Sequence, residues 1–177
     1  MTVLLRPASD ADLPLVGDLH HRSRASAYAD LLDPATFAAR GPSMLAEWWS
    51  ERWRWERDTH RLTVAEQGGS LLGFTYIGPS ETPGAAELYA IHVDPAWVGA
   101  GIGRQLMLKA LTDLPRYGEP RAVLWVLEAN KTARRFYEAG GWHPDGASRV
   151  APVNDQPLPQ LRYTHSLPRA PLPSSSR

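Results

Sequence analysis

Three glycines within five positions are the first feature of this chain that points to chemistry. They are Gly99, Gly101 and Gly103, and a helical pattern follows them directly. Glycine loses more backbone entropy on folding than other residues, so a cluster of glycines indicates a tight turn or a close approach to the backbone. The first N–H groups of a helix have no intrahelical partner, and the helix dipole favours an anion in front of them. The pattern favours a phosphate site, with a tightly packed strand-to-helix connection as the alternative.

Two common phosphate-binding loops do not match these residues. A dinucleotide fingerprint, G-x-G-x-x-G, would need its third glycine at position 104 or 106, where the chain has Arg104 and Leu106. A Walker loop would need Lys and then Ser or Thr after the last glycine, and the chain has Arg104 and Gln105 there. Both loops are therefore excluded.

The elements around the glycines alternate between strand and helix. A strand over 86–95 precedes them, and apolar residues with helical spacing predict a helix that begins at Gly103 and ends at Pro115. A continuous apolar strand over 121–130 follows, and then a short helix capped by Asn130. This order predicts a mixed α/β fold with at least one parallel crossover.

The remaining elements are predicted with weaker signals. The chain has 177 residues, enough for a single domain, which we expect over 1–167. In order, these elements are a strand over 2–6, a capping box from Ser9 to Asp12, a helical region to about residue 57, a hairpin over 61–80, a last strand over 160–167, and a Pro/Ser tail over 168–177 that is expected to be disordered.

Composition narrows the function classes. Basic and acidic residues number 19 each, which argues against a nucleic-acid-binding protein and against binding to an anionic membrane. The absence of cysteine excludes disulfides, thiolate metal sites and a cysteine nucleophile, and we expect no metal. No segment is long and apolar enough for a signal peptide or a membrane span, so the expected location is cytoplasmic.

The glycine segment over 93–106 resembles motif A of the GNAT superfamily of N-acetyltransferases, with its core pattern Q/R-x-x-G-x-G/A. The stretch from Val98 to Gly103 falls on that pattern, and Val98 departs from the usual Gln or Arg. The segment over 130–142 is similar to the family's second signature, N-x-x-A-x-x-F-Y-E-x-x-G-F/W. Its defining positions are all matched, by Asn130, Ala133, Phe136, Tyr137, Glu138, Gly141 and Trp142.

The resemblance implies a fold and a donor substrate. The fold would be a GNAT-like, mostly antiparallel sheet, with a splayed parallel pair of strands over 86–94 and 121–128 and helices on its sides. The donor would be acetyl-coenzyme A (acetyl-CoA), its pyrophosphate on the backbone of 98–104 and its pantetheine arm paired with the backbone of Ile91 to Val93. The implied cofactor-binding residues are Ile91, His92, Val93, Val98, Gly99, Ala100, Gly101, Ile102, Gly103, Arg104, Asn130, Ala133 and Phe136.

The resemblance also implies two catalytic residues. Tyr137 would protonate the thiolate leaving group, and it lies about 10 Å along the same helix from Asn130. Glu87, eleven residues before Val98, would act as the base, directly or through water; the alternative is an exposed carboxylate at the start of a strand. His92 is a second titratable candidate in the same strand, where a structural role is the favoured interpretation. The backbone N–H near Val93 would meet the oxyanion.

The acceptor site has the weakest signature. In this fold the early helices usually form one wall of that site, so Tyr28, Trp49 and Trp53 are its candidate residues. The favoured alternative is a tryptophan-rich helix that simply packs on the sheet.

Together the patterns predict an enzyme that transfers an acetyl group from acetyl-CoA to a primary amine of a small molecule, by direct attack in a ternary complex. One alternative is acetylation of protein or peptide N-termini. Another is a module that binds acyl-CoA without turnover. A homodimer is compatible with the sequence, which does not fix the oligomeric state.

Overall fold

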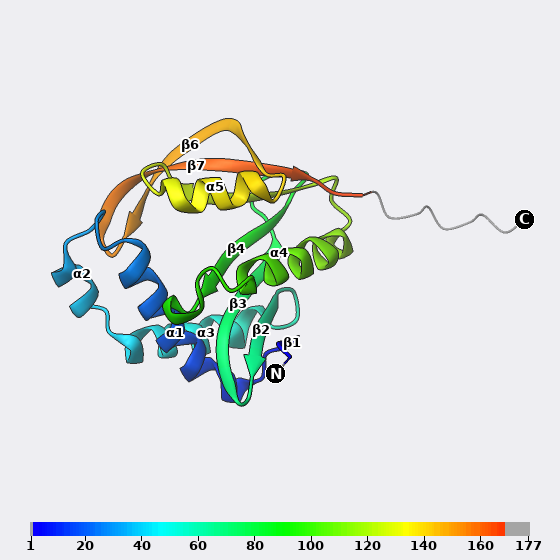
Figure 1. Cartoon of the computed structure of the whole chain (residues 1–177). Helices are drawn as coiled ribbons and strands as arrows, with labels where there is room; N and C mark the ends of the chain where they lie inside the picture. Colours follow the sequence, from blue (N-terminus) through cyan, green and yellow to red (C-terminus); the bar gives the residue numbers. More distant parts are fainter. Residues whose placement is uncertain (1, 169–177) are drawn as a thin grey trace, which may run out of the picture.

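The computed structural model describes residues 2–168, which fold around one seven-stranded sheet (Figure 1). The tail predicted over 168–177 lies, apart from its first residue, outside the described residues. The strand order is β1-β2-β3-β4-β5-β7-β6, and only β4 and β5 run parallel. The strands are β1 (Leu4–Pro7), β2 (Arg61–Gln67), β3 (Ser70–Pro79), β4 (Ala86–Val93), β5 (Arg121–Leu127), β6 (His143–Val153) and β7 (Gln156–Ser166).

Helices cover both faces of the sheet. On one face, Val16 of α1 and Trp49 of α3 pack against Phe74 and Tyr76 of β3. On the other face, Met107 of α4 lies in a core cluster with Trp142, against which α5 packs. The helices are α1 (Leu13–Ala27), α2 (Pro34–Ala38), α3 (Pro42–Glu56), α4 (Ile102–Asp113) and α5 (Lys131–Ala139).

The parallel pair opens after its first residues, as expected. Ala86 pairs with Ala122 and Glu87 pairs with Val123, and the register between β4 and β5 ends there. Asp94 N–H donates to Leu72 O on the β3 side at 2.8 Å. Because backbone groups alternate in direction along a strand, those of Ile91 and Val93 point the other way, into the gap between β4 and β5. The splay therefore leaves a cleft edged by free backbone groups of β4.

A bulge in β4 changes which side chains share a face. Simple alternation puts Glu87 and His92 on opposite faces of this strand. In the structure the β3–β4 register shifts between Tyr76 and Ile77, which adds one residue, Tyr89, to β4. As a result Glu87 and His92 both lie on the face that α1 and α3 cover.

The hairpin of β6 and β7 is larger than the sequence indicated. The predicted last strand over 160–167 begins earlier, at Gln156, and β6 was not predicted at all. Pro144 and Gly146 in β6 read as turn signals, but β6 is an edge strand, where proline is tolerated. Asn154 and Asp155 both have positive φ, which is the geometry of a two-residue hairpin turn.

Candidate active site

A cavity of about 340 Å³ occupies the splay between β4 and β5. Its walls come from α1, α3, β4, β5, α5 and the β6–β7 hairpin. Of the predicted site residues it brings together Tyr28, Trp49, Glu87, Ile91, His92, Asn130, Ala133 and Tyr137. Segments that are more than a hundred residues apart in sequence thus line one site.

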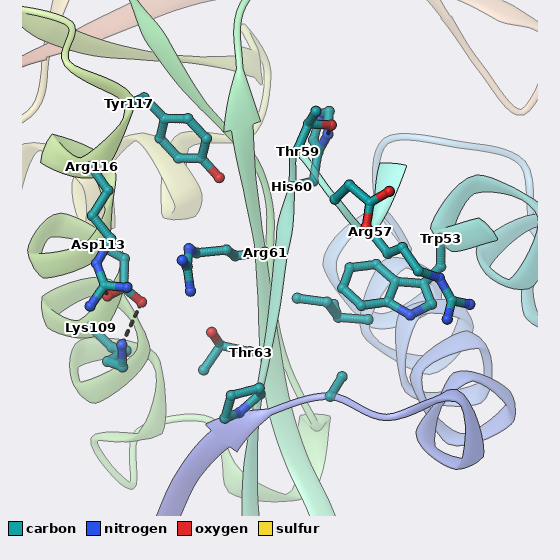
Figure 2. Close-up of a pocket in the computed structure, with 14 residues that line it drawn as sticks. Trp53, Arg57, Thr59, His60, Arg61, Thr63, Lys109, Asp113, Arg116 and Tyr117 are labelled. Carbon is teal, nitrogen blue, oxygen red and sulfur yellow. Dashed lines mark hydrogen bonds and ion pairs between the residues drawn. The ribbon is translucent and has the colours of Figure 1, made fainter. Parts of the chain in front are cut away.

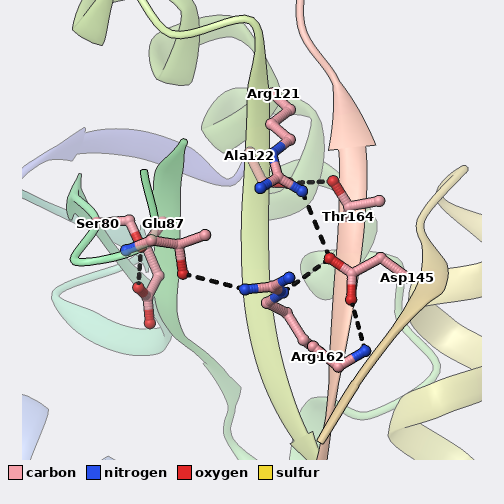
Figure 3. A network of polar contacts seen from close by, with 9 residues as sticks. Ser80, Glu87, Arg121, Ala122, Asp145, Arg162 and Thr164 are labelled. Carbon is pink, nitrogen blue, oxygen red and sulfur yellow. Dashed lines mark hydrogen bonds and ion pairs between the residues drawn. The ribbon is translucent and has the colours of Figure 1, made fainter. Parts of the chain in front are cut away.

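Glu87 is a buried carboxylate on the wall of this cavity, with 8% of its surface exposed. Ser80 Oγ donates a hydrogen bond of 2.6 Å to Glu87 Oε2, and Thr82 N–H donates to Ser80 Oγ at 3.1 Å. Figure 3 shows that Arg162 bridges β5: its Nη1 donates to Thr82 Oγ1 at 3.5 Å on the Glu87 side, and its Nε donates to Asp145 Oδ2 at 2.7 Å on the other side. Burial raises the pKa of Glu87 above its ordinary value, although the Ser80 hydrogen bond opposes this. A raised pKa suits a carboxylate that takes up a proton near neutral pH.

Tyr137 reaches the cavity from α5. Asn130 Oδ1 caps this helix by accepting from Ala133 N–H at 3.1 Å, so the predicted N-cap is confirmed. Burial, and then the neighbouring Tyr28, raise the pKa of Tyr137 well above the ordinary value for tyrosine. The phenol therefore keeps its proton at neutral pH and can donate it.

Two histidine rings lie next to each other beside the catalytic candidates, with their planes tilted by 43°. The ring centroids of His20 and His92 lie 4.5 Å apart, and Trp49 Nε1 donates to His20 Nδ1 at 3.0 Å. His92 Nδ1 lies 3.0 Å from Ser23 Oγ. Burial lowers the pKa of His92 to about 3 and holds the pKa of His20 well below its ordinary value. Both rings are neutral at pH 7, and so low a pKa makes His92 a poor base, which supports its structural interpretation.

The glycine segment lies outside this cavity, at the N-terminus of α4. Gly99 and Gly101 have φ of +86° and +84°, which side chains rarely adopt, and the space where a Cβ would stand is open at both. Gly101 is the N-cap of α4 and offers no side-chain cap, so the first-turn N–H groups face outward. These residues therefore fit a phosphate group. At Gly103 a side chain is disfavoured for a different reason, because a Cβ there would meet the Phe136 ring at 3.4 Å.

The candidates for an acceptor wall are not all in the same place. Tyr28 and Trp49 line the cavity, but Trp53 lies one helical turn further along α3 and lines a second cavity. Figure 2 shows Trp53 there, across β2 from Lys109 and Asp113 of α4, which pair with each other. Trp53 therefore does not contribute to the splay cavity, because one turn carries it toward the start of β2.

None of the three cations at this cavity was predicted from the sequence as a site residue. Arg24, Arg52 and Arg149 line it together with the aromatic side chains of Trp48, Tyr89 and Trp125. His20 and Arg24 of α1 and its C-cap residue Tyr28 recur every four residues along one side of the helix. That spacing was a usable signal, but only the tertiary structure shows what this face meets.

Comparison with known proteins decides the family. Residues 25–142 match the model of the acetyltransferase (GNAT) family. The chain belongs to this family. The predicted class, an acetyl-CoA-dependent N-acetyltransferase of GNAT type, is confirmed by this membership.

Individual relatives agree with this assignment. A probable N-acetyltransferase of Mycobacterium tuberculosis is 28% identical over 91% of this chain and 92% of its own length. A mycothiol acetyltransferase of Thermomonospora curvata is 39% identical over 85 residues, 48% of this chain but only 28% of that protein. The PaiA N-acetyltransferase of Thermoplasma acidophilum, solved in complex with coenzyme A, shares the fold with a TM-score of 0.72 at 17% identity, over 94% of this chain and 99% of that one.

Within residues 2–168, we also searched for membrane-spanning helices and for metal sites. None of the helices in this part is long and apolar enough to cross a membrane. No group of three or more His, Cys, Asp or Glu residues in it is placed to hold a metal ion.

Proposed function

We propose that this chain transfers the acetyl group of acetyl-CoA to a primary amine of a small molecule, by direct attack in a ternary complex. The observation that carries the proposal is that Glu87 and Tyr137, from different elements, line the same cavity at the splay. One has a pKa raised toward neutrality, and the other keeps its proton. A base and an acid are what aminolysis of a thioester requires.

The donor would lie along the β4 edge. The backbone groups of Ile91 and Val93 point into the splay and would pair with the pantetheine arm, with Asn130 and Ala133 on the opposite wall. The open, uncapped backbone from Gly99 to Arg104 would hold the pyrophosphate. The side chain of Val98 is 72% exposed, so this position would contribute its backbone only.

The chemical step would divide between two side chains. Glu87 would accept the proton of the acceptor ammonium, whose ordinary pKa is about 10.4. Glu87 lies four positions before Ile91 in β4, at about 3.3 Å of rise per position, so the proton would travel through water. As the new N–C bond forms and the C–S bond breaks, the Val93 N–H would stabilise the oxyanion. Tyr137 would give its proton to the departing thiolate, and its phenolate would take up the second proton that the nitrogen loses, so that the amide, the free thiol and a protonated Glu87 result.

The test uses the purified chain. Acetyl-CoA should raise the melting temperature and release heat in calorimetry, and a panel of amines should release free thiol from it. The panel includes polyamines, aminoglycosides, amino acids and peptide N-termini, so that protein N-terminal acetylation appears as selective turnover of peptides. Absence of both heat and thermal shift contradicts the donor. Binding of acetyl-CoA without thiol release from any amine contradicts the transfer.

A further inference from the structure

One cation at the splay cavity has no counter-charge. Arg24 is half-buried in α1, and within residues 2–168 its guanidinium makes no hydrogen bond or ion pair; it lies 5.7 Å from the ring centroid of Tyr28. The other two arginines are engaged. Arg52 Nε donates to Glu56 Oε2 at 2.7 Å, and Arg149 Nε donates to Gln160 Oε1 at 2.8 Å.

The charges that line the cavity do not balance. Three guanidinium groups face it, against one carboxylate, Glu87. Arg149 is the cation whose field acts on Glu87 most strongly, so Glu87 does not neutralise Arg24. Burial lowers the pKa of Arg24, which is the mark of a charge held out of water without an anionic partner. A charge that is partly out of water and lacks a partner costs stability, and an anionic ligand would supply that partner.

Arg24 also lies where the reacting groups meet. Ser23, its neighbour, contacts His92 of β4, and Tyr28, the C-cap residue of α1, acts electrostatically on Tyr137 of α5. The helix therefore crosses the open end of the splay. The backbone proposed to hold the donor pyrophosphate, from Gly99 to Arg104, does not line this cavity. A donor held there would keep its pyrophosphate away from Arg24, which leaves the acceptor to supply the anion.

We propose that Arg24 binds an anionic group of the acceptor, so that the substrate is a small amine that also carries a carboxylate or a phosphate. This deepens the proposed function and rests on it. The guanidinium suits such a group because its planar fork can donate two parallel hydrogen bonds to one carboxylate or phosphate. Tyr89 and Trp125 add aromatic faces to the same cavity, and Glu87 adds the negative charge that attracts the ammonium end.

The test compares amines that differ only in the anion. Amino acids are paired with their primary amides, and 2-aminoethyl phosphate with ethanolamine. Each is titrated into the protein with coenzyme A present, using tryptophan fluorescence and calorimetry, and each is then assayed for thiol release from acetyl-CoA. In the wild type, at least one anionic member should bind at least about tenfold more tightly than its neutral partner.

Variants separate the acceptor role from other roles. Arg24→Gln should remove the preference for the anion, Arg24→Lys should keep part of it, and the Kd of coenzyme A should not change in either. The control is Arg54→Gln, at an exposed position on α3 outside the cavity. The proposal is overturned if neutral partners bind as well as anionic ones, if no anionic member binds, or if Arg24→Gln weakens coenzyme A instead. Acceptor titrations do not depend on turnover, so a failure of acetyl transfer is seen separately, as absent thiol release.

Discussion

Glu87 and His92 lie on the same face of β4 although they are five residues apart, because the bulge at Tyr89 reverses the alternation of the strand. This places a buried carboxylate and a neutral imidazole on one wall of the splay cavity. A regular strand would turn one of them toward α4. The candidate base therefore depends on one extra residue in one strand.

Replacing Tyr137 tests the proposed acid. Tyr137→Phe keeps the ring and its packing but removes the proton donor, so turnover should fall at least about tenfold while the Kd of acetyl-CoA stays within about twofold. Thiol release and calorimetry measure the two quantities. The control is Tyr117→Phe, which removes a hydroxyl that donates to Ile77 O at 3.3 Å beside the other cavity. Unchanged turnover in Tyr137→Phe would remove this residue from the mechanism.

Replacing Glu87 tests the proposed base through pH. Burial raises the pKa of Glu87, so the acidic limb of kcat/KM in the wild type should lie above the ordinary value of 4.5. Glu87→Gln can still accept from Ser80 but cannot take up a proton, so this limb should disappear and kcat should fall about 10²-fold or more. Glu81→Gln, an exposed position in the neighbouring loop, should keep it. If the acidic limb of kcat/KM persists in Glu87→Gln, then Glu87 is not the base.

The folded state should also respond to Glu87→Gln. A carboxyl whose pKa is raised on folding contributes stability at low pH that is lost as pH rises through the folded value. Glu87→Gln has no carboxyl at this position, so it does not lose stability in this way as pH rises. The melting temperature of Glu87→Gln minus that of the wild type should therefore increase from pH 4 to pH 7. Glu81→Gln should not show this trend.

Alanine substitutions at two glycines with similar positive φ can distinguish an effect on coenzyme A binding from an effect on stability. Gly101 has φ of +84° at the N-terminus of α4, and Gly69 has φ of +81° in the β2–β3 turn. Alanine at either position should cost about 1 kcal/mol of unfolding free energy, because both are held in the left-handed region. Only Gly101→Ala should also weaken coenzyme A, as measured by calorimetry. Equal affinities in the two variants would argue against a phosphate site at this turn.

The histidine pair should make the protein sensitive to acid. The pKa of His92 is about 3 in the folded state, against an ordinary value of 6.5, so the unfolded chain takes up the proton first. Stability is then fully present above about pH 6.5 and falls as the pH drops toward 3, by up to about 1.4 kcal/mol per pH unit for each such histidine. Denaturant unfolding between pH 7 and pH 5 measures this slope. His92→Gln should flatten it, whereas His143→Gln, at an exposed position on β6, should not.

Local signals explain what the sequence could predict. The positive φ of Gly99 and Gly101, the cap at Asn130 and the apolar stripe of α4 are all determined within a few residues, so their patterns are legible in the chain itself. The splayed pair was expected from the resemblance, and the register confirms it.

The features that were missed depend on distant partners. The bulge at Tyr89 exists only through the register with β3, and the edge strand β6 tolerates Pro144 only because its position in the sheet requires no donor there. In the sequence Arg24 is an ordinary helix residue, and only the packing of α1 across the splay places it at the cavity. Trp53 was grouped with Trp49 by helical spacing, but the length of one turn moves it to another cavity.

The splay has a mechanical consequence. Two residue pairs join β4 to β5, whereas seven join β5 to β7 and seven join β3 to β4. The sheet is therefore weakest along this one line, and the pairs at Ala86 and Glu87 form a hinge at its end. Widening the gap would break no ladder on either side, so the width of the cleft is set by the side chains of the core cluster that joins β4 to β5, and not by backbone hydrogen bonds between these strands.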